Sequence, residues 1–330
     1  MKKNSIIVFL FKCILAALPL LILIGYTALF PFAYMDAEYP AWAYSKEASH
    51  TRQPEQEDAV LILGDSRAMA DILPTELGSN VQNLAVGGAT AIEMYYTLSS
   101  YLKYNEAPDT AVVMFAPFHY SYMDNFWERT VYFNYLSVSE LSEVFSNARQ
   151  TASETVLTEN CLMEAVSYRL RLPNKYLPAL ANSRLFMRCS DNKALYQQLS
   201  KERGHGLFGT ADGSSDLSYE VNYTQMQHSG DAALIALYLN KLLALCEEQN
   251  IRVILEQPPM NEASYAKLQN SYLSEYTIYM EETQSNYPDF LINSEIPCYE
   301  NRFFGDSSHL NHTGGAVYTQ EFKTKYADLF

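Results

Sequence analysis

The fold of this chain is decided by the stretch Val60-Leu61-Ile62-Leu63-Gly64-Asp65-Ser66-Arg67. Its unbroken apolar residues, which begin at Ala59, are typical of a strand buried on both faces inside a parallel sheet. The strand runs directly into a Gly-Asp-Ser turn, so a serine hydroxyl follows the carboxyl end of a buried strand. Open parallel sheets place their sites at that edge. The stretch therefore predicts a parallel α/β sheet with a site at its end.

Strand and helix patterns alternate on both sides of a long interruption. The predicted strands after the first are 83–88, 110–116, 251–256 and 290–292. The predicted helices are 91–104, 231–248 and 262–282, with a last helix that starts near Thr313. Such alternation indicates right-handed βαβ units and a parallel sheet.

The interruption runs from about 121 to 230, where the chain is polar and aromatic. Helical stretches are predicted near 137–150, 159–171 and 191–203, and a Gly/Ser/Asp-rich loop over 204–218. Because this region is too long for a simple crossover, we expect a mostly helical insertion that lies over one end of the sheet.

The N-terminus predicts a membrane anchor. Lys2, Lys3 and Lys12 precede an uncharged, mostly apolar run over 13–35, about as long as the ~20 residues that cross a bilayer. The lysines should stay on the cytoplasmic side, with the rest of the chain extracytoplasmic. A cleaved signal peptide and a merely buried helix are the alternatives, although a signal's apolar region has only about 7–15 residues.

Composition divides the chain after residue 35 into a stalk and an acidic domain. Residues 36–57 are polar, contain two prolines and are predicted to form a stalk between the anchor (1–35) and an extracytoplasmic domain (58–330). Beyond residue 35 the chain has 20 Lys and Arg against 38 Asp and Glu, a formal charge of −18. Nucleic acid and anionic surfaces are therefore not expected as partners of this domain.

Cysteine usage leaves two alternatives. Four cysteines outside the apolar run permit two disulfides with three connectivities in an oxidising compartment, and free buried thiols are the other interpretation. These four are Cys161, Cys189, Cys246 and Cys298. Since no Cys/His spacing is that of a zinc site, no metal or other cofactor is expected.

A second segment near the end of the chain complements the first. It reads Gly305-Asp306-Ser307-Ser308-His309-Leu310-Asn311. A serine hydroxyl needs a base within hydrogen-bond reach, and an imidazole serves near neutral pH. The imidazole needs a carboxylate to fix its tautomer. We therefore predict Ser66 as nucleophile, His309 as base and Asp306 as its partner. The alternative is an ordinary turn at one end and a helix-capping loop at the other.

These segments resemble a known family. Gly64-Asp65-Ser66, Gly87-Gly88 and Asp306-x-x-His309 occur in the order and positions of the SGNH (GDSL-type) hydrolase superfamily, over about 58–328 outside the insertion. The resemblance implies a three-layer α/β/α flavodoxin-like fold around a central parallel sheet. It also implies an oxyanion hole built by the backbone N–H groups of Ser66 and of Gly87 or Gly88.

One block departs from the family pattern. After the third strand the family has an Asn that donates to the oxyanion, whereas this chain has Phe115-Ala116-Pro117-Phe118-His119-Tyr120. Loss of one such donor costs about 10²–10³ in turnover. A replacement is expected from His119, Tyr120 or the insertion. Arg67, His119 and Tyr120 are also candidate substrate contacts, with a structural ion pair as the alternative for Arg67.

The anchor, the insertion and this departure are similar to a narrower group. These are the membrane-anchored SGNH-like proteins of bacterial envelope modification, which include the D-alanyl transfer protein of lipoteichoic acid and alginate O-acetylation proteins. Segments 83–96 and 256–261 carry further similarity. The resemblance implies a single-pass cell-membrane protein that works beside a membrane-bound O-acyltransferase.

The implied activity is that of an esterase (a hydrolase) or an acyltransferase. Its acyl substrate would be a cell-envelope polysaccharide or a teichoic-type polymer. A second hypothesis is a catalytically inactive SGNH domain that binds acylated glycan or scaffolds the acyltransferase complex. An intact Ser66, Asp306 and His309 set favours the first hypothesis, and the absent Asn keeps the second open.

Overall fold

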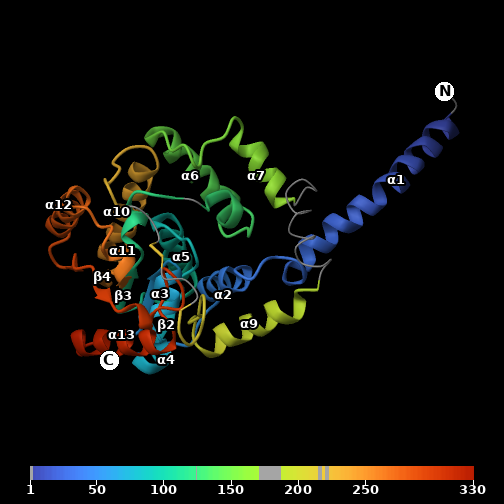
Figure 1. The fold of residues 1–330 in the computed structure, drawn as a ribbon. Helices are drawn as coiled ribbons and strands as arrows, with labels where there is room; N and C mark the ends of the chain where they lie inside the picture. Colours follow the sequence, from blue (N-terminus) through green and yellow to red (C-terminus); the bar gives the residue numbers. More distant parts are fainter. Residues whose placement is uncertain (1–2, 124, 171–186, 215–217, 220–222) are drawn as a thin grey trace.

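The computed structural model describes residues 3–123, 125–170, 187–214, 218–219 and 223–330 of the chain (Figure 1). Its first element is α1, Lys3–Leu29. Within it, Ser5–Leu29 has a mean hydropathy of 2.8 and is long and apolar enough to cross a membrane. Figure 1 shows α1 extending away from the rest of the chain. This agrees with the apolar helix predicted at the N-terminus.

Five strands form the central sheet. They are, in spatial order, β2 (Val81–Asn83), β1 (Val60–Gly64), β3 (Thr110–Met114), β4 (Arg252–Glu256) and β6 (Leu291–Ile292). All four pairings between them are parallel. Every residue of β1 and β3 is buried, as expected for strands covered on both faces. The predicted mixed α/β class with a parallel central sheet is confirmed.

Helices pack against the sheet in two groups. α5 (Ala91–Tyr104) and α10 (Asp231–Glu248) contact each other beside β1 and β4. α3 (Ser66–Asp71) and α4 (Pro74–Leu77) contact β1 and β2 and pack on α13 (His312–Lys325). Figure 1 shows the two groups on opposite sides of the sheet.

The remaining described elements complete the domain. They are η1 (Pro31–Ala33), α2 (Tyr39–His50), η2 (Pro117–Tyr120), η3 (Phe126–Val131), β5 (Met260–Asn261), α11 (Glu262–Tyr265), α12 (Asn270–Asn286), β7 (Cys298–Tyr299) and η4 (Asn301–Phe303). The described part of the insertion holds three further helices, close to their predicted positions: α6 (Val138–Thr151), α7 (Cys161–Arg169) and α9 (Cys189–Lys201).

The prediction of a stalk over 36–57 is wrong for most of its length. Residues 39–50 form α2, which packs against α5 and α9. Trp42 is only 1% exposed, and Ser45 Oγ donates to Leu84 O over 2.7 Å. The prediction relied on the polar composition and overlooked the aromatic side chains that the helix buries. Pro40 lies in the first turn of α2, where proline favours the start of a helix rather than a linker. The folded domain therefore begins almost directly after α1.

Two other predicted elements differ from the structure. β2 overlaps the segment predicted as a strand that ends in a glycine turn only at Asn83. Residues 84–86 are loop, while the predicted turn at Gly87-Gly88 is present, with Gly88 at φ +74°. The helix predicted over 262–282 is broken into α11 and α12. At the break, Gln269 N–H donates to Tyr223 O, so the backbone there bonds outside the helix. All five cysteines are free; of the four outside α1, Cys161 and Cys246 are buried, whereas Cys189 is half-buried and Cys298 is exposed.

Gly64 ends β1 where two backbones approach closely. A Cβ built on Gly64 would lie 1.9 Å from Met114 O and 2.5 Å from Ala68 Cβ. Because β1 and β3 pair at this point, Gly64→Ala must separate the strands. We expect a loss of about 3 kcal/mol in the free energy of unfolding, seen as a thermal midpoint about 5–10 °C lower.

The matched control for this substitution is Gly25→Ala, since a Cβ at Gly25 meets nothing within 4 Å. An unchanged midpoint for Gly64→Ala would show that the close contact between β1 and β3 is absent in solution.

Candidate active site

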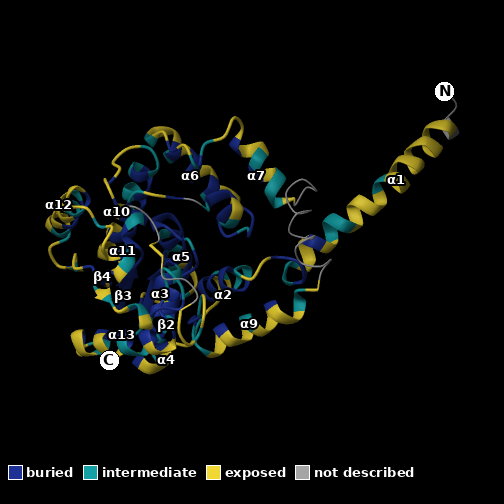
Figure 2. Ribbon diagram, in the orientation of Figure 1, coloured by how far each residue is buried: buried dark blue, intermediate teal, exposed yellow. Residues whose placement is uncertain are grey.

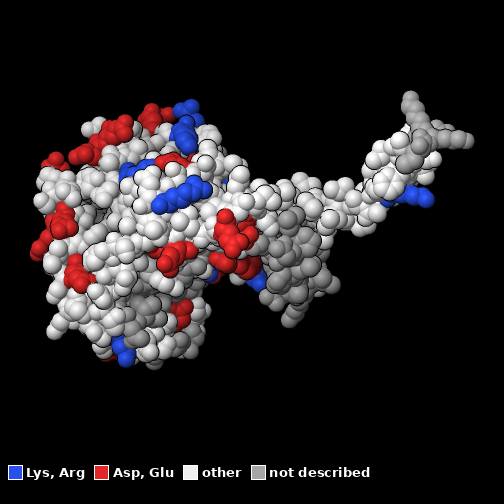
Figure 3. Space-filling view, turned by 90° about the horizontal axis from the view of Figure 1, so that it is seen from above, with Lys and Arg blue, Asp and Glu red and all other residues white. Residues whose placement is uncertain are grey.

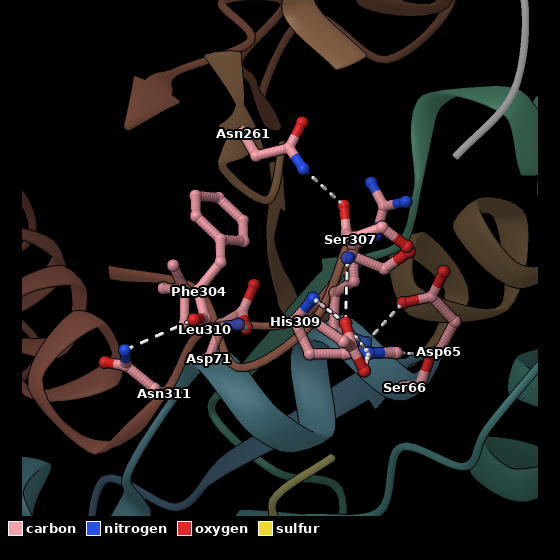
Figure 4. A network of polar contacts seen from close by, with 12 residues as sticks. Asp65, Ser66, Asp71, Asn261, Phe304, Ser307, His309, Leu310 and Asn311 are labelled. Atoms are coloured by element: carbon pink, nitrogen blue, oxygen red, sulfur yellow. Dashed lines mark hydrogen bonds and ion pairs between the residues drawn. The ribbon is translucent and has the colours of Figure 1, made fainter. Parts of the chain in front are cut away.

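The structure brings together three side chains from opposite ends of the chain. Ser66 is the first residue of α3, directly after β1, while Asp306 and His309 lie on the loop before α13. His309 Nε2 lies 2.7 Å from Ser66 Oγ, and His309 Nδ1 lies 2.9 Å from Asp306 Oδ1. Figure 4 shows His309 beside Ser66. Serine, imidazole and carboxylate therefore form one continuous hydrogen-bonded chain, with the residues predicted from the sequence.

The loop 304–311, called here the catalytic loop, is closed by its own backbone. Asp306 Oδ1 accepts from the N–H groups of Ser308 (2.8 Å) and His309 (2.9 Å). Gly305 N–H donates to His309 O over 2.8 Å. The carboxylate that orients the imidazole therefore also shapes the loop that carries it.

Two side chains hold the catalytic loop from outside. Asp71, at the end of α3, accepts from Leu310 N–H over 3.0 Å. Asn261 Nδ2 donates to Ser307 O over 2.9 Å (Figure 4). Both side chains are buried. Because Ser66 and Asp71 share α3, the helix that presents Ser66 also positions the loop that carries His309.

Burial and hydrogen bonding shift the two carboxylic acids in opposite directions. Burial alone would raise the pKa of Asp306, but its bond to His309, the charge of His309 and two backbone N–H groups lower that pKa below its usual value. Burial raises the pKa of Asp71 well above its usual value, against the lowering effects of Leu310 N–H and Arg67. Asp306 is therefore an anion at neutral pH. Asp71 therefore lowers the free energy of unfolding as the pH rises from the pKa of this group in the unfolded chain toward its pKa in the folded chain.

Asp65 organises the turn beneath the nucleophile. It accepts from Arg67 N–H (2.9 Å), from Ala116 N–H (2.8 Å) and from His119 Nδ1 (2.8 Å). Burial would raise the pKa of Asp65, but the bond and charge of His119, followed by Arg67 and Ala116 N–H, lower it. Asp65 therefore contributes stability above its unfolded pKa, which is lost as the pH falls through the folded value. These bonds join the ends of β1 and β3 under Ser66.

The three candidate substrate contacts lie in the interior. Arg67 is 2% exposed and its guanidinium lies 5.6 Å from the centre of the Phe118 ring. His119 is buried against Asp65. Tyr120 is buried and accepts a hydrogen bond of 3.0 Å from Gln257 Nε2. This placement favours a structural role for Arg67 over contact with a substrate. It also gives His119 and Tyr120 roles in packing.

The Gly87-Gly88 turn lies among side chains that the sequence did not point to. Arg129 Nη1 donates to Gly87 O over 3.2 Å, and Arg129 Nη2 pairs with Glu38 Oε1 over 2.6 Å. A Cβ built on Gly88 would lie 3.0 Å from Arg129 Nη1 and 3.1 Å from Asn125 Nδ2. Glu38 lies in the predicted stalk, and Asn125 and Arg129 lie in the insertion. A side chain at Gly88, whose φ is +74°, would therefore be strained, and the turn has an amide and a guanidinium beside it.

The insertion also reaches the base. The Phe208 ring stacks on the His309 ring, with centres 4.4 Å apart and planes 23° from parallel. Thr210 N–H donates to Gly305 O over 2.9 Å, and His312 N–H donates to Ala211 O over 3.1 Å. This part of the insertion thus lies on the catalytic loop, at the end of the sheet. No motif in the Gly-rich sequence around Phe208 indicates the stacking.

Other features of the structure lie apart from this site. Within the described ranges, no group of three His, Cys, Asp or Glu side chains could hold a metal ion. A cleft of about 810 Å³ lies at the opposite, amino-terminal edge of the sheet, lined by residues that include Tyr101, Asn80 and Arg203. None of its lining residues belongs to the serine, histidine and aspartate chain.

The arrangement can perform nucleophilic acyl chemistry, because an imidazole in contact with a serine hydroxyl can take its proton as the oxygen attacks. No protein-family model matches the chain, and no curated protein matches it. The assignment of a function to this site therefore depends on the geometry of Ser66, His309 and Asp306.

Proposed function

We propose that the chain is an SGNH-type serine enzyme that hydrolyses or transfers an ester-linked acyl group. The observation that carries this proposal is the contact of 2.7 Å between Ser66 Oγ and His309 Nε2, continued to Asp306 over 2.9 Å. The strand order β2-β1-β3-β4-β6 supports the three-layer flavodoxin-like fold, since it follows the 2-1-3-4-5 order of that fold.

Each residue of the site has a role in this chemistry. His309 Nε2 accepts the Ser66 proton as Oγ attacks the acyl carbon, and Asp306 stabilises the imidazolium that forms. The ester C–O bond then breaks, and the leaving alcohol takes the proton from His309. Water or an acceptor hydroxyl next attacks the acyl-Ser66 carbonyl, giving its proton to His309. The alkoxide of Ser66 leaves and recovers a proton from the same ring.

The oxyanion of each tetrahedral intermediate needs donors opposite Ser66. The backbone N–H groups of Ser66 and of the Gly87-Gly88 turn supply two of them. We assign the third to the Asn125 amide, whose Nδ2 lies 3.1 Å from the position that a Cβ on Gly88 would occupy. An amide from the insertion would thus replace the Asn that is absent from 115–120.

This assignment makes a kinetic prediction. Asn125→Asp keeps the size of the side chain but removes the donor and adds a negative charge near the oxyanion. We expect kcat for an activated ester to fall about 10²–10³-fold with little change in KM, because the bond strengthens only as charge develops. Asn286→Ala, at an exposed position of α12, is the control. A kcat for Asn125→Asp within threefold of wild type would remove Asn125 from the oxyanion hole.

We also propose that α1 anchors the protein by a single pass, with the domain outside the cytoplasm. Only a few residues separate the end of α1 at Leu29 from Glu38, whose carboxylate pairs with Arg129 beside the Gly87 turn. An acyl site so near the anchor supports an envelope polysaccharide or a teichoic-type polymer as substrate. It also supports a membrane-bound O-acyltransferase as partner.

The test is turnover of 4-nitrophenyl acetate by the full chain in detergent, with and without a hydroxyl-rich polysaccharide acceptor. We expect nitrophenolate release, and acetate on the polymer if transfer competes with hydrolysis. A folded chain that releases no nitrophenolate would favour the alternative, a domain that binds acylated glycan or scaffolds an acyltransferase.

A further inference from the structure

Helix α7 turns an apolar face outward. Leu162, Met163 and Leu170 are 64%, 62% and 53% exposed, and Val166 is also exposed. The spacing of 162, 166 and 170 places these side chains along one face of the helix. Cys161 and Ala165 are buried on the other side. The face formed by Leu162, Met163, Val166 and Leu170 is called here the α7 apolar face.

Helix α7 lies on the same side of the domain as the end of α1 (Figure 1). Figure 2 shows exposed residues along α1 and on part of α7. Met187 is 74% exposed, and the next residue, Arg188, donates its N–H to Ala33 O over 3.2 Å, close to where α1 ends. Leu29 and Phe30, at the end of α1, are exposed as well. Several apolar side chains therefore surround the point where α1 joins the domain.

The end of α1 is attached to the domain and is not a free tether. Tyr34 Oη donates to Thr27 O over 2.9 Å, so the chain after α1 folds back on its last turns. Asn192 Nδ2 of α9 donates to Phe32 O and to Met35 O, both over 2.9 Å. These bonds limit rotation of the domain about the end of α1. The side of the domain that faces the bilayer is therefore set by the fold.

We propose that the α7 apolar face lies in the interfacial layer of the bilayer that α1 crosses, so that lipid is its partner. The inference rests on the membrane-spanning role proposed for α1 and is independent of the acyl chemistry. An interfacial helix gains stability by burying its apolar side chains about 5–10 Å into the boundary between head groups and acyl chains. Together, α1 and α7 would then fix the orientation of the domain on the membrane.

Charge supports lipid as the partner. The chain as a whole has a formal charge of −15, yet the described residues 161–170 and 187–188 carry two basic side chains, Arg169 and Arg188, against one acid, Glu164. Figure 3 shows acidic side chains along the rim of the domain away from α1 and a further acidic group where the domain meets the connection to α1, whose visible described surface is mostly uncharged. Apolar side chains gain from burial at the interface of a neutral bilayer, and the low local charge of this stretch adds little repulsion there. The α7 face thus combines the composition and the location of an interfacial contact.

The test uses the full chain in vesicles of phosphatidylcholine, with a single NBD fluorophore and lipids that carry a doxyl quencher just below the head groups. Cys13→Ala, Cys189→Ser and Cys298→Ser remove the cysteines open to labelling, since Cys161 and Cys246 are buried. The fluorophore is attached through Met163→Cys on the α7 apolar face.

Two control positions separate insertion from mere proximity to the anchor. Lys193→Cys is exposed on α9 near the end of α1, and Ile278→Cys is exposed on α12, which Figure 1 shows far from α1. We expect the quenching constant at position 163 to exceed that at 193 and 278 by about threefold or more, with blue-shifted emission at 163 alone. A charge placed by Val166→Glu should reduce quenching at 163, while turnover of a soluble ester stays at the wild-type level.

Equal quenching at the three positions would overturn the proposal, because lipid would then not cover the α7 apolar face. A protein partner would take its place if that face became protected only when a second membrane protein was present. Neither result depends on turnover, so failure of this inference is distinct from failure of the acyl mechanism.

Discussion

Ser66→Ala is expected to lower kcat for an activated ester about 10⁴-fold or more, to the level left by binding and the oxyanion donors alone. The physical reason is that Ser66 Oγ is the hydroxyl within 2.7 Å of the His309 base. Alanine has no hydroxyl with which to form the acyl-enzyme. His309 can then act only on a water molecule that lies in a poor position to attack the ester. The measurement is the steady-state release of nitrophenolate by the full chain in detergent.

The matched control is a serine-to-alanine substitution away from the site, which shows whether a loss of turnover comes from sample handling or misfolding. Ser274, on α12, is exposed and bonds only within its helix, to Asn270 O. Ser274→Ala should keep wild-type kcat, and both variants should keep the wild-type thermal midpoint. Turnover by Ser66→Ala within tenfold of wild type would mean that another group is the nucleophile.

Asp306→Asn is expected to lower kcat about 10³–10⁴-fold while leaving the fold intact. The carboxylate accepts from His309 Nδ1 and is kept ionised, because the bond and charge of His309 and two backbone N–H groups outweigh its burial and lower its pKa. An amide of the same shape can donate to Nδ1, which puts the ring proton on Nε2. The imidazole then faces Ser66 with a donor in place of an acceptor.

Asp212→Asn is the control for this change, since Asp212 is exposed and lies 3.8 Å from His312 Nδ1. The comparison requires kcat and KM for both variants at pH 7 and 8. If kcat of Asp306→Asn stays within threefold of wild type, the Asp306 contact does not serve the base.

Much of the sheet and its site could be predicted because the signals are local. The apolar run before Gly64 can only be a buried strand, and β1 starts at Val60, one residue after the predicted start. Helix α5 agrees with its predicted bounds, and in the structure a capping box of Thr90 and Glu93 holds its start. Ser66, Asp306 and His309 follow from chemistry, since few triads of residue types activate a serine.

The surroundings of the site could not be predicted because they depend on tertiary packing. Glu38 follows an apolar run and reads as linker, yet α2 folds back onto α5 and carries it to Arg129. Asn125 and Phe208 come from an insertion with no periodic signal near either residue, and only the folded chain brings them to Gly88 and His309. Local sequence determines the catalytic side chains, whereas long-range packing determines their environment.

The most direct measurement is covalent labelling of the folded full chain with a fluorophosphonate, followed by peptide mapping. A serine activated by His309 and Asp306 should give one adduct, on the peptide that contains Ser66, with labelling lost in Ser66→Ala and slowed in Asp306→Asn. Absence of any adduct on the folded wild-type chain, or an adduct that persists unchanged in Ser66→Ala, would contradict a serine nucleophile at this site.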